Sequence, residues 1–164
     1  MSAPVSGLLL VGCGKMGGAL LAGWLRRKIA GPIRVIEPDL DATRAFRDRP
    51  DIGIDASAEA LPGDFRPAVV VFAVKPQGMD KVVPAFRHLV GPGTVFLSIA
   101  AGRKIAFFAS HLGPEAAIVR AMPNTPAAVG RGISVLCANR HVSPAGQAAC
   151  EALLDVQVAR VLEV

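Results

Sequence analysis

The feature that most constrains the fold is the stretch GLLLVGCGKMGGALLAGWL at residues 7–25. An apolar run, a cluster of glycines and a second apolar run follow one another without a break. Leu8–Val11 predicts a short buried strand, and the apolar residues between Met16 and Arg27 recur at helical spacing. The stretch therefore predicts a strand that passes through a glycine-rich turn directly into a helix.

Three of these glycines keep the spacing of a dinucleotide-binding loop. In Gly12-x-Gly14-x-x-Gly17, the first glycine allows a tight turn and the second lets the backbone approach a pyrophosphate. The third lets the helix pack closely on the sheet, and the positive end of that helix attracts the phosphates. An ordinary glycine-rich turn of an α/β protein is the alternative, and the predicted strand and helix on either side favour the dinucleotide site.

Strand-like and helical patterns alternate along the rest of the chain. The further strands are predicted at Ile33–Ile36, Ile52–Ile54, Ala68–Val74, Thr94–Ile99, Ala117–Met122, Gly132–Cys137 and Val156–Leu162. The further helical segments are predicted from Asp39 or Asp41 to Arg47, at Ser57–Leu61, Gly78–Leu89, Lys104–Leu112 and Ser143–Leu154. Gly31-Pro32 is expected to close the first unit. The alternation predicts the α/β class: one dinucleotide-binding domain over residues 1–164, with a Rossmann-like, doubly wound, mostly parallel sheet and helices on both faces.

Composition excludes several classes of protein. With 52% hydrophobic and 19% charged residues, the chain is not expected to be disordered. The sequence predicts neither a membrane-spanning run nor a signal peptide, and its three cysteines and three histidines show no metal-ligand spacing. The net charge of +5 is scattered and Tyr is absent, which argues against nucleic-acid binding. We therefore expect a cytoplasmic protein with reduced thiols, and neither a metal, a membrane nor a nucleic acid as a partner.

An acidic residue follows the second predicted strand. Glu37 stands 20 residues after Gly17, where a carboxylate can accept hydrogen bonds from the adenosine ribose and repel a 2′-phosphate. Asp39 is a further candidate on this side of the site. The hypothesis is a preference for NADH over NADPH, and Arg44 is the alternative signal, because its side chain could instead meet a 2′-phosphate.

Two further strand ends carry small residues. Ligands of doubly wound sheets lie outside the carboxyl ends of the strands, and Ala73–Pro76 and Ser98–Gly102 both fall at such ends. The first segment suits close contact with a ribose and pyrophosphate, and the second leaves room for a nicotinamide ring.

The motifs GCGKMGGAL, AVKP, SIAAG and RAMPNTPAAVGRGISVL together resemble the Δ1-pyrroline-5-carboxylate reductase family. The resemblance implies reduction of a cyclic imine to proline by NADH or NADPH. It implies a set of cofactor-binding residues: Gly12, Cys13, Gly14, Lys15, Met16 and Gly17 at the phosphates, and Ala73, Val74, Lys75, Pro76 and Ala100 at the ribose and nicotinamide. It places Ala100, Ala101, Asn124 and Thr125 near the substrate.

The sequence departs from the family in two respects. Glu37 and the run Asp55-Ala56-Ser57-Ala58 replace residues that many members carry on the adenosine side. The resemblance also implies a second domain, which is helical, forms the dimer and holds the substrate carboxylate. This domain is expected to be absent from this chain. Two other functions stay open: a related dehydrogenase of the β-hydroxyacid type, and a non-catalytic dinucleotide-binding module.

Overall fold

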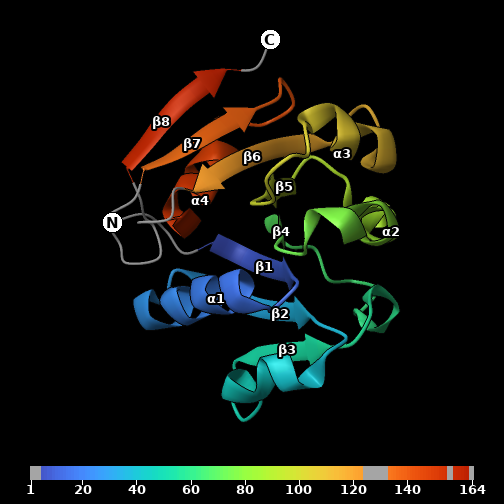
Figure 1. Ribbon diagram of the computed structural model, residues 1–164, viewed down its shortest axis with the longest axis vertical. Helices are drawn as coiled ribbons and strands as arrows, with labels where there is room; N and C mark the ends of the chain where they lie inside the picture. The colour runs from blue at the N-terminus through green and yellow to red at the C-terminus, as the bar shows by residue number, and fades with distance from the viewer. Residues whose placement is uncertain (1–4, 124–132, 155–156, 163–164) are drawn as a thin grey trace.

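The computed structural model describes residues 5–123, 133–154 and 157–162. Their strands form one eight-stranded sheet in the order β3-β2-β1-β4-β5-β6-β7-β8 (Figure 1). The strands are β1 (Val5–Val11), β2 (Ala30–Ile36), β3 (Ile52–Asp55), β4 (Val69–Phe72), β5 (Val95–Ser98), β6 (Ala117–Pro123), β7 (Ile133–Ala138) and β8 (Gln157–Leu162). The first six strands are parallel and follow the Rossmann order 3-2-1-4-5-6, whereas β7 pairs antiparallel with β6. The predicted α/β fold class is confirmed.

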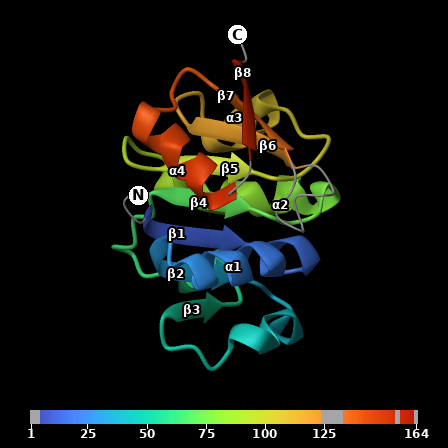
Figure 2. The same cartoon turned by 90° about the vertical axis from the view of Figure 1, so that its left-hand side faces the viewer.

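Helices cover both faces of this sheet. The α-helices are α1 (Lys15–Arg27), α2 (Met79–Val82), α3 (Ile105–Leu112) and α4 (Pro144–Leu154), and the 3₁₀ segments are η1 (Leu40–Phe46), η2 (Ala58–Ala60), η3 (Pro76–Gly78) and η4 (Val83–Leu89). Helices α1 and α4 lie over one face, and α2, η4 and α3 lie over the other (Figure 2). All four residues of β4 are buried, because helices cover the sheet on both faces. A strand buried in this way has an uninterrupted apolar sequence, as β4 does.

Each face has its own apolar core. Beneath α1 and α4, the indole of Trp24 is fully buried and donates a hydrogen bond to the Leu153 carbonyl (2.7 Å), joining the two helices. On the other face, the Phe72 ring lies 5.9–6.0 Å from three further phenylalanine rings, those of Phe86, Phe96 and Phe108. Aromatic pairs at this spacing add to the stability that burial provides.

One predicted helix is broken in the structure. Instead of a continuous helix at Gly78–Leu89, the chain forms the short elements η3, α2 and η4. The reason is Pro84, which has no N–H to donate and whose ring clashes with the carbonyl four residues earlier. The segment predicted from Asp39 or Asp41 forms the 3₁₀ helix η1, and its cap is Asp39, whose carboxylate accepts from the Asp41 N–H (3.1 Å).

The boundary expected at Gly31-Pro32 is wrong, because both residues lie inside β2. Gly31 is in register with Ser6 of β1, and Ile33 is in register with Leu8. Pro32 has no N–H to donate to the β1–β2 ladder, and no pair joins it to Gly7, whose φ is +83°. The ladder then continues, so that β2 begins three residues earlier than the apolar run suggested.

Candidate functional site

The site is built at the carboxyl edge of the parallel strands. Val11, Phe72 and Ser98, the last residues of β1, β4 and β5, are in register in one row across the sheet. The loops that follow these strands therefore emerge side by side. Figure 1 looks onto this edge, and Figure 2 shows it from the side, with the arrowheads of β1 and β3 pointing to the right.

The glycine loop after β1 is packed against the loop after β4 with no room for side chains. A Cβ on Gly12 would stand 2.8 Å from Val74 Cγ1 and 2.9 Å from the Ala73 carbonyl carbon, and Gly12 has a φ of +95°. A Cβ on Gly17 would overlap the Gly12 carbonyl oxygen and stand 3.3 Å from the Ala73 Cβ. Glycine is therefore required at both positions, for the reasons expected of a tight turn and of close helix packing.

Gly14 differs from these two glycines. No atom lies within 4 Å of the place where its Cβ would stand, and Gly14 is exposed at the N-cap of α1. Its neighbours Lys15 and Met16 are also exposed. The amino end of a 13-residue helix thus opens onto free space, with the partial positive charge and the unpaired N–H groups that bind phosphates.

Glu37 braces the glycine loop. Its Oε1 accepts a hydrogen bond from the Cys13 N–H (2.8 Å), and its Oε2 accepts one from the Asp39 N–H (3.0 Å). Burial, and then the charge of Glu37, raise the pKa of the Cys13 thiol. Arg44, the alternative signal on this side, forms an exposed ion pair with Asp41 (3.1 Å). Glu37 therefore lies directly after β2 and links the loops after β1 and β2.

The loops after β4 and β5 form the other half of the edge. The Ala73 N–H donates to the Val11 carbonyl (2.8 Å), which carries the sheet ladder into the β4 loop. Ala100 is buried and its N–H donates to Ser98 Oγ (3.3 Å), while Ala101 is exposed. In the other loop, Val74 and Pro76 are partly buried and Lys75 is exposed.

One residue of this half has no counterpart in the sequence predictions. The Arg103 guanidinium donates from Nε (3.2 Å) and Nη2 (2.9 Å) to the Pro76 carbonyl oxygen. It thereby joins the β5 loop to the β4 loop across 27 residues of sequence. The only signal in the sequence is a basic residue directly after SIAAG, which does not reveal where its side chain points.

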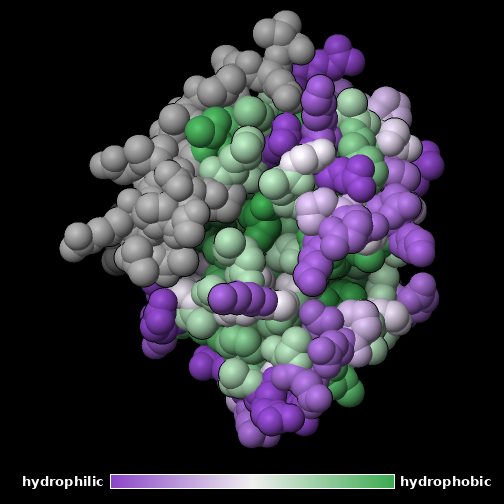
Figure 3. All heavy atoms as spheres, viewed as in Figure 1, coloured by the Kyte–Doolittle hydropathy of each residue, from purple (hydrophilic) through white to green (hydrophobic). Residues whose placement is uncertain are grey.

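Exposed large hydrophobic side chains gather at the same edge. Among the described residues these are Met16 (48% exposed), Leu40 (55%) and Met122 (53%), which follow β1, follow β2 and end β6. Figure 3 looks onto this edge and shows hydrophobic residues across its middle, with hydrophilic ones to the right and below. An apolar surface with a polar rim is typical of a surface that another molecule or domain covers. The substrate-side candidates Asn124 and Thr125 lie outside the described residues.

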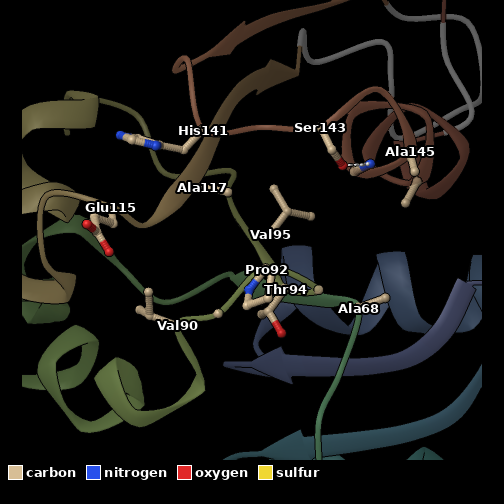
Figure 4. Close-up of a pocket in the computed structure, with 14 residues that line it drawn as sticks. Ala68, Val90, Pro92, Thr94, Val95, Glu115, Ala117, His141, Ser143 and Ala145 are labelled. Carbon is tan, nitrogen blue, oxygen red and sulfur yellow. Dashed lines mark hydrogen bonds between the residues drawn. The ribbon is translucent and has the colours of Figure 1, made fainter.

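A cavity of ≈ 620 Å³ lies elsewhere, at the amino ends of β5 and β6 (Figure 4). The turn Gly91–Thr94 lines it, with Glu115 and His141 at one side and the first turn of α4 at another. Its lining includes none of the predicted cofactor residues, so the cavity has no part in the candidate site. Within the described part of the chain, no group of three or more His, Cys, Asp or Glu is arranged to hold a metal ion.

The part of the chain that contains these loops matches a known protein family. Residues 7–102, from β1 to the turn after β5, match the family described as NADP oxidoreductase coenzyme F420-dependent. The chain belongs to this family. The matched range spans the glycine loop, Glu37, the β4 loop and the β5 loop as far as Gly102.

Individual relatives support the predicted resemblance. The pyrroline-5-carboxylate reductase of Escherichia coli is 35% identical over 136 residues, which are 82% of this chain and 50% of that enzyme. The chain therefore spans about half the length of this curated relative. A pyrroline-5-carboxylate reductase from Coxiella burnetii superposes with a TM-score of 0.85 at 26% identity, over 96% of this chain and 59% of that one. Plasmodium falciparum pyrroline carboxylate reductase with NADP bound has the same fold, at a TM-score of 0.78 and 23% identity over 98% of this chain and 59% of its own.

Among the residues that the structure describes, no helix is long and apolar enough to cross a membrane. The resemblance to the amino-terminal part of pyrroline-5-carboxylate reductases is confirmed.

Proposed function

We propose that this chain is the dinucleotide-binding half of an NAD(P)H-dependent pyrroline-5-carboxylate reductase. The observation that carries the proposal is the glycine loop, in which Gly12 and Gly17 are closed against the β4 loop while Gly14 opens the helix end to solvent. The curated relative at 35% identity has this activity, which favours it over a β-hydroxyacid dehydrogenase or a non-catalytic module.

When bound, a reduced nicotinamide supplies a hydride, which can reduce a protonated cyclic imine. The amino end of α1 and the backbone of the glycine loop would bind the pyrophosphate. The small residues of the β4 and β5 loops would orient the nicotinamide and keep water from it. A protonated imine is already an electrophile, so the chain need not supply a general acid, and its contribution would be binding and orientation.

We further propose that Glu37 makes the chain prefer NADH. Its carboxylate is held by the Cys13 and Asp39 N–H groups, so it cannot easily turn away from an incoming 2′-phosphate. Two like charges held close together repel each other strongly when partly shielded from water.

The test of this preference compares dissociation constants for NADH and NADPH. In the Glu37→Gln variant, which keeps an acceptor but loses the charge, NADPH affinity should rise about tenfold relative to NADH. Asp51→Asn removes a carboxylate that is paired with Arg49 (2.7 Å) at the amino end of β3, away from this edge, and it should leave the ratio unchanged. Tighter binding of NADPH than of NADH by the unaltered chain would overturn the preference.

The test of the reductase function uses both the 164-residue chain and the complete gene product. We expect the chain to bind NADH but to reduce Δ1-pyrroline-5-carboxylate poorly, because the resemblance places the substrate carboxylate and the dimer contacts in a helical domain. The complete gene product should reduce the imine and should not oxidise β-hydroxyacids. The free thiols Cys13, Cys137 and Cys150 suit a reducing compartment such as the cytoplasm.

A further inference from the structure

The loops after β4 and β5 would enclose the nicotinamide end of the cofactor if the proposed function holds. Among the described residues, the last backbone hydrogen bond between these loops runs from the Ile99 N–H to the Phe72 carbonyl, at 3.3 Å. Beyond that bond, Val74 and Ala100 pack in the apolar core of this face, but their alkyl side chains make no directional contact from one loop to the other. A connection formed by a side chain would therefore set the width of the space between the loops.

Arg103 supplies that connection. Its Nε and Nη2 both donate to the Pro76 carbonyl oxygen, which also accepts from the Met79 N–H. The guanidinium lies 4.7 Å from the centre of the Phe107 ring, in the first turn of α3. The contact with the aromatic ring on one side and the two hydrogen bonds on another restrict the orientation of this side chain.

We propose that Arg103 is a positioning residue that sets the spacing of the β4 and β5 loops around the nicotinamide ring. The inference rests on the proposed function. Arg103 acts through the Pro76 carbonyl and through the chain from Ala73 to Pro76. Lysine cannot replace it fully, because an ammonium group neither stacks as a plane nor presents two donors in a fixed fork.

The proposal separates two parts of the cofactor. The adenosine and pyrophosphate would contact the glycine loop and Glu37, which Arg103 does not touch. They would also contact the start of the β4 loop, which the hydrogen bond from the Ala73 N–H to the Val11 carbonyl (2.8 Å) holds independently of Arg103. ADP-ribose carries those parts but lacks the nicotinamide ring. Loss of Arg103 should therefore weaken binding of NADH and leave binding of ADP-ribose nearly unchanged, whereas a general loss of structure would weaken both.

The experiment titrates NADH and ADP-ribose into the unaltered chain and into Arg103→Ala, Arg103→Lys and Arg27→Ala. The expected rise in the NADH dissociation constant is about tenfold for Arg103→Ala and about threefold for Arg103→Lys, with ADP-ribose changed by less than about twofold. Arg27→Ala is the matched control, because Arg27 also donates to two backbone carbonyls of a distant segment, those of Ala152 and Leu153. This control should lower the unfolding temperature without changing the ratio of the two affinities.

Each other outcome counts against the inference. If Arg103→Ala weakens the binding of both ligands equally, or of neither, Arg103 does not set the spacing of the β4 and β5 loops around the nicotinamide. The proposed dinucleotide site is not affected by that outcome. If the unaltered chain binds neither NADH nor ADP-ribose, the proposed function fails, and the role of Arg103 fails with it.

Discussion

The glycine loop after β1 and the paired loops after β4 and β5 face the same edge of the sheet, but they are held in different ways. The close packing of the glycine loop depends on the absence of side chains, because a Cβ at Gly12 or Gly17 would collide with neighbouring backbone atoms. The paired loops are fixed by a side chain that is present, that of Arg103. The first kind of contact depends on hard sterics and the second on hydrogen bonds, so substitutions in the two regions should differ in size and in kind.

The largest effect should follow Gly17→Ala. The new Cβ would overlap the Gly12 carbonyl oxygen, and both partners are backbone or helix that cannot yield. We expect a loss of about 2–4 kcal/mol in the free energy of unfolding, measured with denaturant, and loss of NADH binding. Gly18→Ala is the control, because its Cβ would meet only the Cys13 carbonyl oxygen at 3.8 Å and Phe46 at 4.0 Å. A stability equal to that of the Gly18 variant would contradict the steric account.

Gly14→Ala should separate binding from stability. Its Cβ would meet no atom within 4 Å, and its φ of −73° suits any residue, so the cost in stability should stay below about 1 kcal/mol. The same Cβ would occupy the space in front of the helix end, and the dissociation constants of NADH and ADP-ribose should both rise about tenfold. Calorimetry with both ligands measures the effect, and unchanged affinity would remove Gly14 from the site.

A smaller effect is expected from Phe107→Leu in the other region. The leucine keeps most of the apolar contact with Phe108 but loses the ring on which the Arg103 guanidinium rests. A cation–π contact at a partly exposed site is worth about 0.5–1 kcal/mol, so the NADH dissociation constant should rise about two- to fivefold. ADP-ribose titration is again the reference, and an equal change in its affinity would show that the ring merely stabilises α3.

The smallest effect concerns the Cys13 thiol. Burial, followed by the charge of Glu37, raises its pKa. Glu37→Gln removes this negative charge, and its removal favours the thiolate form of Cys13. The pH profile of Cys13 alkylation should therefore move to lower pH. Mass spectrometry of the Cys13 peptide follows the reaction separately from Cys137 and Cys150. An unchanged profile would show that the Glu37 carboxylate does not act on this loop electrostatically.

Local patterns in the sequence predict most of this edge, because the residues that form each loop are close together in the chain. Gly12-x-Gly14-x-x-Gly17 lies between an apolar run and a helical one, and each strand end is marked by small residues or proline. Two elements differ from the prediction, and in each a proline acts against or within the apolar pattern. Pro84 breaks a helix that apolar periodicity favoured, and Pro32 lies in β2 because the parallel ladder passes over it and continues.

The sequence by itself determined the α/β architecture, the glycine loop and the acid that follows β2, because each depends on residues close together in the chain. The tertiary structure alone decided which backbone closes on Gly12 and Gly17, that Glu37 accepts from the Cys13 N–H, and that Arg103 meets the Pro76 carbonyl. Those contacts join residues brought together by parallel strand pairing, which places successive strand ends side by side while a crossover of many residues separates them in sequence. Residue spacing along the chain carries no record of such contacts, since they depend on the register and the loop paths of the folded sheet.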